Sequence, residues 1–117
     1  MKITKVEVMA TNVPFRGSEG NTGEIALGKW ELCRFVIVKV HTDEGIVGYG
    51  ESAPFARLSP LGQKPIIDVL VDYVAPSVIG LDPFNTEEIW KAMDRATPDN
   101  AQAKGAVDMA LYDIMGK

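Results

Sequence analysis

Residues 101–117 read AQAKGAVDMALYDIMGK, and this stretch decides the fold. Its apolar residues recur at intervals of three and four, which is the pattern of a single apolar stripe along an α-helix. Because most of the stripe is alanine, the helix can approach a partner surface closely. We therefore predict a helix over residues 101–116 with this stripe facing a packed layer: Ala103, Ala106, Val107, Ala110, Leu111 and Ile114.

The first half of the chain is predicted to be a sheet. In residues 2–14 valine and alanine alternate with polar residues, the period of a strand with one buried face. Residues 30–42 are apolar on both faces around FVIV at 35–38, which indicates a central strand. Gly45 supplies the positive φ of a tight turn, and residues 46–53 form a third strand. Residues 1–54 are thus predicted to be a three-stranded antiparallel meander.

The second half is predicted to be helical, with two helices in residues 62–97. The first runs from about residue 65 to 75, where Pro76 ends it, and turns one face inward: Ile67, Leu70, Val71 and Val74. The second starts after Asn85, a helix cap with Glu88 as its capping-box partner, and runs to about residue 96. Three strands followed by three main helices make a single α+β domain over residues 1–117.

Composition and charge exclude several classes of protein. The net charge is −4 and is spread along the chain, which argues against a nucleic-acid partner. No run of about 18 apolar residues is present, so we expect no membrane span. The single cysteine, Cys33, cannot form an internal disulfide, and this favours a cytoplasmic location.

Motifs that carry chemistry are weak in this sequence. GYGESA at residues 48–53 fits a dinucleotide-binding pattern, but it lies in a strand without a following helix, so close approach of another backbone or side chain to the two glycines is the better interpretation. His41 is expected to be exposed, beside no partner that sequence reveals. Lys104 and Asp108 are expected to pair on the polar side of their helix. The carboxylates show no metal-binding spacing, so we predict no catalytic residue and no metal ligand in this chain.

Two loops remain as the candidate site. Residues 15–29, rich in glycine, leave the first strand, and residues 54–62 leave the third, so in a meander both depart from the same end of the sheet. They could be two solvated loops, but glycine flanked by aromatic residues favours a mobile two-part lid. The candidate substrate contacts are Phe15, Arg16, Glu19, Trp30, Phe55, Arg57 and Leu58.

Four segments in this order resemble the N-terminal capping domain of the enolase superfamily, in its mandelate racemase and muconate-lactonizing branch. They are KITKV at 2–6, TDEGIVGYGE at 42–51, VIGLDP at 78–83 and AVDMALYDIMGK at 106–117. The resemblance covers nearly the whole chain. It implies a cap whose two loops set specificity over a (β/α) barrel, and a barrel that holds Mg²⁺ and abstracts a proton alpha to a carboxylate.

The same resemblance implies that the catalytic barrel is absent from this chain, since such a barrel needs about 200 further residues. We therefore expect a truncated specificity cap that is inactive alone, whose partners are the missing barrel and, in the whole enzyme, a small carboxylate substrate. The alternative is a stand-alone interaction module that self-associates or binds a partner through the apolar stripe of the last helix. A complete small enzyme is the weakest interpretation.

Overall fold

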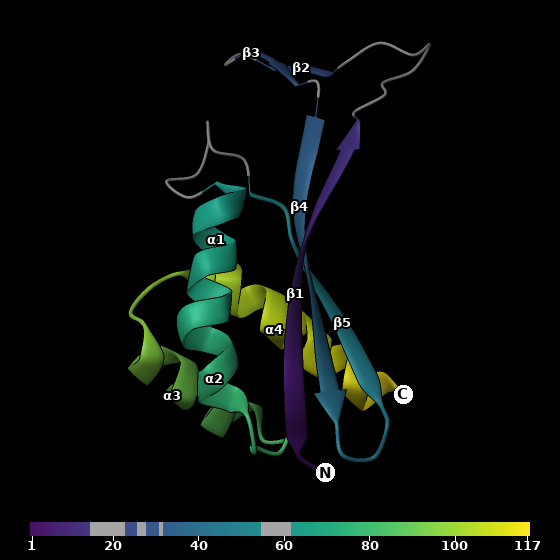
Figure 1. Ribbon diagram of the computed structural model, residues 1–117, viewed down its shortest axis with the longest axis vertical. Coiled ribbons are helices and arrows are strands. Elements are labelled where there is room, and N and C mark those ends of the chain that lie inside the picture. The colour runs from purple at the N-terminus through teal and green to yellow at the C-terminus, as the bar shows by residue number, and fades with distance from the viewer. Residues whose placement is uncertain (15–22, 26–27, 31, 55–61) are drawn as a thin grey trace.

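The computed structural model describes residues 1–14, 23–25, 28–30, 32–54 and 62–117. Its centre is a three-stranded antiparallel sheet in the order β1 (Ile3–Pro14), β4 (Leu32–Thr42) and β5 (Val47–Ser52). Helices cover one face of this sheet (Figure 1). They are α1 (Gln63–Val69), the π-helical turn η2 (Leu70–Val74), α2 (Ala75–Val78), α3 (Thr86–Ala96) and α4 (Ala101–Gly116). The predicted meander followed by helices is confirmed.

The central position of β4 follows from its apolar run. Val36, Val38 and Val40 are fully buried under the helices, and each pairs with β1 on one side and β5 on the other. Gly45 closes the β4–β5 turn with φ of 79°, as predicted. Thr42 completes this turn, because its hydroxyl donates to the Ile46 carbonyl at 2.8 Å.

The prediction of an unbroken loop over residues 15–29 is wrong in its second half. Two short strands, β2 (Gly23–Ile25) and β3 (Gly28–Trp30), pair with each other antiparallel. Trp30 therefore belongs to β3, and the central strand begins at Leu32. The period-two test misses these strands because each has only 3 residues and a glycine, the residue least suited to a strand.

Helix α4 lies on the sheet through the glycines of β5. A Cβ at Gly50 would overlap the Ala106 carbonyl, and one at Gly48 would overlap the Ala110 carbonyl and come within 2.6 Å of Ile114. The predicted close approach is thus confirmed, and it lies within the chain. The alanine-rich stripe is the core itself, with every member at most 1 % exposed, so it is not the free surface that the interaction-module alternative requires.

The last turns of α4 also complete the outer edge of β5. Asp113 accepts from the Tyr49 amide at 2.9 Å, and Lys117 donates to the Val47 carbonyl at 2.7 Å. These side chains satisfy backbone groups that an edge strand otherwise presents to other chains. The pKa of Asp113 is lowered by its hydrogen bond with Lys117 and then by the Tyr49 amide.

The helix that follows residue 62 does not end at Pro76, as the sequence predicts. In a regular α-helix this proline would clash with the carbonyl of Asp72, four residues earlier. Here the helix widens first: the Ala75 amide bonds to the Leu70 carbonyl, five residues back, and the helix continues to Val78. The widening also changes which side chains point inward. Val71 is 51 % exposed, and the buried positions recur every four residues: Ile66, Leu70, Val74 and Val78.

Helix α3 begins as predicted and lies antiparallel to α4. The Asn85 side chain accepts from the Glu88 amide at 3.2 Å and donates to the Glu88 carboxylate at 3.0 Å. The predicted Lys104–Asp108 pair is wrong, because both residues face α3 instead. Lys104 is 2 % exposed and binds Asp94 at 2.8 Å, while Asp108 accepts from the Trp90 indole at 2.8 Å.

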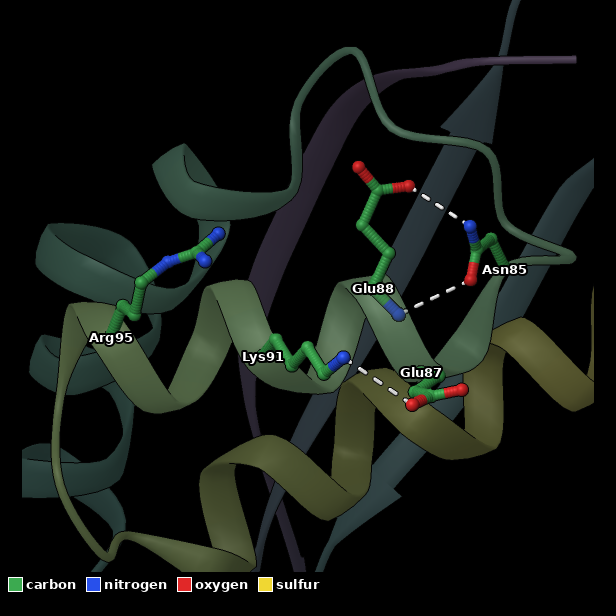
Figure 2. A pocket seen from close by; sticks show the side chains of 5 residues that line it. All are labelled: Asn85, Glu87, Glu88, Lys91 and Arg95. Carbon is green, nitrogen blue, oxygen red and sulfur yellow. Dashed lines mark hydrogen bonds and ion pairs between the residues drawn. The ribbon is translucent and has the colours of Figure 1, made fainter.

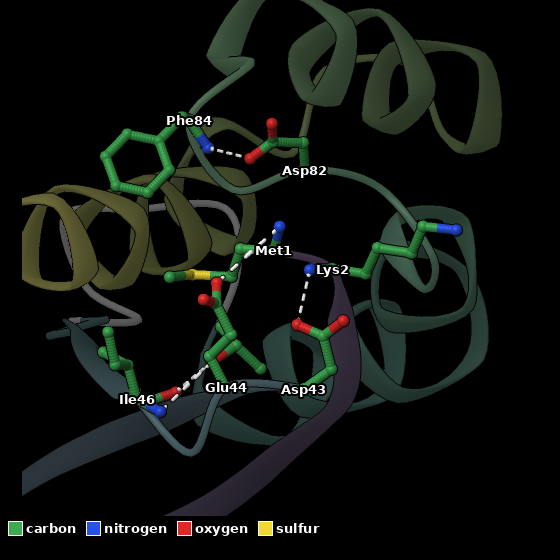
Figure 3. Close-up of polar contacts among 8 residues, drawn as sticks. Met1, Lys2, Asp43, Glu44, Ile46, Asp82 and Phe84 are labelled. Atoms are coloured by element: carbon green, nitrogen blue, oxygen red, sulfur yellow. Dashed lines mark hydrogen bonds and ion pairs between the residues drawn. The ribbon is translucent and has the colours of Figure 1, made fainter.

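The end of the sheet that holds the N-terminus is closed by short polar contacts. The Lys2 amide donates to Asp43 at 2.9 Å, and the terminal ammonium of Met1 lies 3.7 Å from Glu44 (Figure 3). On the other side of β1, the Ile3 amide donates to the Leu81 carbonyl at 2.9 Å. Asp82 accepts from the Phe84 amide at 2.9 Å and turns the chain toward α3.

Candidate functional site

The opposite end of the sheet projects as a two-stranded arm. Pairing of β5 stops at Val36↔Ser52, whereas β1 and β4 stay paired from Thr11↔Phe35 to Pro14↔Leu32. At about 3.3 Å per residue, the arm extends roughly 13 Å beyond the last β5 pair. Figure 1 shows it rising past the helices, with β2 and β3 at its tip.

The arm leads to the first of the two segments that the sequence predicts as the candidate site, and most of the predicted contact residues lie outside the described residues. Phe15, Arg16 and Glu19, which follow the arm in sequence, lie outside the described residues. The same holds for Phe55, Arg57 and Leu58 after the third strand. Trp30 is placed only by its backbone, at the end of β3. The described residues therefore give the frame of the two segments, and their contacts with a substrate stay a prediction.

At the base of the arm a single side chain spans both of its strands. The Gln63 amide nitrogen donates to the Phe35 carbonyl of β4 at 2.8 Å and to the Asn12 side-chain oxygen of β1 at 3.2 Å. Gln63 is the first residue of α1, immediately beyond Gly62 and residues 55–61. The sequence gives no signal for this contact, because it joins positions 28 and 51 residues apart.

The sheet face away from the helices carries a charge cluster that the sequence analysis missed. Glu7 accepts from Lys5 at 2.7 Å and lies 2.8 Å from His41, so His41 does have a partner. The hydrogen bond from Lys5 and then that with His41 lower the pKa of Glu7 to about 2. Positions 7 and 41 are neighbours only because Glu7↔Lys39 and Lys5↔His41 pair across the strands. Since Glu7 stays ionised, it serves as a fixed negative charge, which is unsuited to take up or release protons near neutral pH.

A surface hollow of ≈ 320 Å³ lies on the outer side of α3. Figure 2 shows its lining: Asn85, Glu87, Glu88, Lys91 and Arg95. Asn85 and Glu88 cap the helix, and Lys91 pairs with Glu87 at 3.3 Å along it. These polar groups serve the helix itself, since carboxylates in a first turn complement the helix dipole. The hollow is a helix surface with ordinary side-chain pairing, and it offers no catalytic set.

Within the described parts of the chain, no three or more His, Cys, Asp and Glu side chains are grouped so that they could hold a metal ion. No helix of the described residues is long and apolar enough to cross a membrane. The candidate site stays the two predicted segments, and the arm and the start of α1 are the described elements next to them in sequence.

The comparisons with known proteins agree with this architecture. Residues 5–117 match the family described as the mandelate racemase / muconate lactonizing enzyme, N-terminal domain. The chain belongs to this family. It thus belongs to the enolase superfamily, as the resemblance in the sequence predicts, and its fold is that of the N-terminal capping domain.

Individual relatives are similar over the whole chain. The hydrophobic dipeptide epimerase of Enterococcus faecalis is 36 % identical over 117 residues, which is 100 % of this chain and 32 % of the relative. The N-succinyl-L-Arg/Lys racemase of Bacillus cereus is also 36 % identical, over 100 % of this chain and 31 % of that protein. The chain thus spans about a third of the length of these relatives.

Solved structures give the same result. The dipeptide epimerase of Enterococcus faecalis complexed with Mg and L-Leu-L-Tyr superposes with a TM-score of 0.90 at 36 % identity, over 99 % of this chain and 31 % of that one. The N-succinyl Arg/Lys racemase of Bacillus cereus gives 0.91 at 35 % identity, over 99 % and 30 %. The Mg of the Enterococcus faecalis complex has no matching group of His, Cys, Asp and Glu side chains among the described residues of this chain.

Proposed function

We propose that this chain is the substrate-specificity cap of a racemase, epimerase, cycloisomerase or dehydratase that abstracts a proton alpha to a carboxylate. The family match over residues 5–117 carries the proposal, because that family description names an N-terminal domain. The arm supports it, since a ribbon that projects from a packed body can reach over a neighbouring domain. In this function the chain selects and covers the substrate, and a barrel domain supplies the base and Mg²⁺.

The substrate class we favour is a dipeptide or an N-acylated amino acid. Of three relatives that align over 100 % of the chain, the two at 36 % identity carry these substrates in their names, a hydrophobic dipeptide epimerase and an N-succinyl-L-Arg/Lys racemase. The third, a cis-3-hydroxy-L-proline dehydratase, is 32 % identical. The sugar-acid dehydratases align over a smaller part, 71 % of the chain for D-mannonate dehydratase. Acid sugars are therefore the second class to assay.

The chain alone is expected to be inactive, because in this proposal the base and Mg²⁺ belong to the barrel domain, and the described residues include no group of three or more His, Cys, Asp and Glu side chains that could hold a metal ion. The test incubates the chain with Mg²⁺ and L-Leu-L-Tyr in D₂O and follows the alpha protons by NMR. The same assay is applied to a chimera in which residues 1–117 replace the matching region of the Enterococcus faecalis epimerase. Exchange by the chimera and none by the chain supports the proposal. Exchange by the chain alone, or a folded chimera that exchanges no substrate of either class, contradicts it.

The proposed partners are the barrel domain and a small carboxylate, and the proposed location is the cytoplasm, from the single cysteine. Self-association is also proposed, although not through the buried stripe of α4. Two large apolar side chains of that helix are exposed, Met109 at 54 % and Tyr112 at 60 %, and they are the surface we propose for it. A monomeric mass by light scattering at high concentration would contradict self-association, and with it the interaction-module alternative in its self-associating form.

A further inference from the structure

Gln63 joins three parts of the molecule that the sequence keeps apart. It opens α1, and its side-chain nitrogen reaches the backbone of β4 and the side chain of β1. A primary amide has two N–H donors, so these two acceptors use the full donor capacity of that nitrogen. The contact to Phe35 is part-buried and short, 2.8 Å, which is the geometry of a well-formed hydrogen bond.

The two residues that this contact joins, Gln63 and Asn12, each lie close in sequence to one of the two predicted substrate segments. Asn12 lies two residues before Pro14, where β1 ends and residues 15–22 begin. Gln63 follows Gly62, where residues 55–61 end. One side chain therefore links the points at which the two predicted substrate segments meet the described fold.

The plainer interpretation is that Gln63 only stabilises the first turn of α1. The structure argues against it, because the helix cap is Gly62, which has no side-chain capping bond, and the Gln63 amide points away from the helix to the sheet. At this level β5 no longer pairs with β4, and Gln63 of α1 contacts the arm at Asn12 and Phe35. The two Gln63 hydrogen bonds hold the arm against α1 at the end of the sheet where β5 no longer pairs with β4.

We propose that Gln63 is a positioning residue, which sets the angle of the arm relative to the start of α1 and thereby the substrate selectivity of the cap. This inference rests on the proposed function for its effect on selectivity, and only on the described contacts for its effect on geometry. Removing the two donors should free the arm without unfolding the domain.

The first experiment measures geometry in the 117-residue chain. Spin labels are placed at Val13→Cys on the arm and Asp68→Cys on α1, in a Cys33→Ser background, and their distance distribution is measured by electron paramagnetic resonance. Gln63→Glu keeps the size but puts an acceptor against the Phe35 carbonyl, and we expect its distribution to be about twice as wide. Gln63→Lys keeps N–H donors and should restore a narrow one. Lys64→Gln, at the next exposed position, is the matched control.

The second experiment measures selectivity in the chimera. The ratio of kcat/KM for L-Leu-L-Tyr and L-Ala-L-Val should change about tenfold in Gln63→Glu, mainly through KM, and return in Gln63→Lys. An unchanged distance distribution in Gln63→Glu, at an unfolding midpoint equal to wild type, overturns the geometric claim. If Gln63→Glu fails to fold, Gln63→Ala is used in its place and the same outcomes apply. An active chimera whose ratio does not change overturns the claim on selectivity, whereas an inactive wild-type chimera counts against the proposed function alone.

Discussion

The two ends of the sheet differ in how they are packed. We call the part where β5 pairs with β4, from Val36↔Ser52 to His41↔Val47, the closed end, and the part that forms the arm the open end. At the closed end β5 lies against α4 so tightly that Gly48 and Gly50 leave no room for a methyl group, and three strands share a fully buried core. At the open end two strands continue alone as the arm, with Val13 44 % exposed and Gln63 as the polar link to the helices. The same two strands, β1 and β4, take part in both.

The difference in packing predicts that the two ends of the sheet respond differently to mutation. Buried apolar area stabilises the closed end by about 25 cal/mol per Å², so mutations there should act on global stability. Where the structure describes burial on the arm, Asn12, Val13 and Arg34 are exposed, and Thr11 and Phe35 are half-buried. The arm is therefore expected to open locally at low cost, which is the usual property of elements that contact ligands. Substitutions at the closed end should therefore change folding, and those at the open end should change only local geometry.

The largest effect is expected for Gly50→Val at the closed end. Its Cβ would overlap the Ala106 carbonyl, a backbone atom that cannot move without displacing α4. Overpacking of this kind should lower the free energy of unfolding by about 3 kcal/mol, measured by urea denaturation. Gly105→Ala in α4 is the control, because a Cβ there meets nothing within 4 Å. It should stabilise the chain by about 1 kcal/mol as alanine favours the helix. A Gly50→Val protein as stable as wild type would show that the α4–β5 contact is not tight.

The same substitution made at both ends tests the comparison directly. Val38→Thr places a hydroxyl in a site with no exposed area, and it should cost about 2 kcal/mol for the buried polar group. Val13→Thr, on the arm, should change the free energy of unfolding by less than about 0.5 kcal/mol. Equal losses at the two positions, measured by urea denaturation, would refute the division into a packed end and a projecting arm.

The sequence predicted the closed end better than the open end, and the reason is the range of the interactions. Alternation in β1, the glycine turn at Gly45 and the Asn85 cap are local patterns, and each is found in the structure. The glycines at 48 and 50 could also be interpreted, because an unexplained pair of glycines in a strand indicates close approach. The predicted helix end at Pro76 is wrong, because a π-helical turn has no sequence signature strong enough to outweigh a proline.

For the candidate site, the sequence predicts where the two segments leave the sheet, and it does not predict the contacts around that point. That two segments leave one end of the sheet follows from meander topology, but the step between β5 and the arm depends on strand register, which sequence periodicity does not give. Gln63, like the Glu7–His41 contact, joins residues far apart in sequence. A polar residue on its own carries no signal of its distant partner, so such links appear only with coordinates.

A smaller effect is expected where α3 meets α4. Asp94 is the partner of Lys104, whose side chain is only 3 % exposed, so Asp94→Ala leaves a buried ammonium without its carboxylate. The loss should be about 1.5 kcal/mol in the free energy of unfolding, since Asp94 itself is 64 % exposed and water can replace part of the interaction. Glu87→Ala, which removes a pair exposed on both sides, is the control and should change stability by less than about 0.5 kcal/mol. If the two variants lose the same amount, burial of Lys104 does not matter.

The smallest effect is expected for Glu7, on the face of the sheet that the helices leave open. Hydrogen bonds from Lys5 and with His41 hold its pKa at about 2 in the folded chain, against an ordinary value of 4.5. A carboxylate whose pKa falls on folding stabilises the fold above its unfolded pKa, and this contribution is lost as pH falls from about 4.5 toward 2. The difference in unfolding free energy between wild type and Glu7→Gln should therefore be constant near neutral pH and shrink across this window. Glu51→Gln, on β5 at the other edge of the sheet, controls for the loss of one surface carboxylate. A difference between wild type and Glu7→Gln that stays the same from pH 7 to pH 2 would show that the cluster does not act through the charge of Glu7.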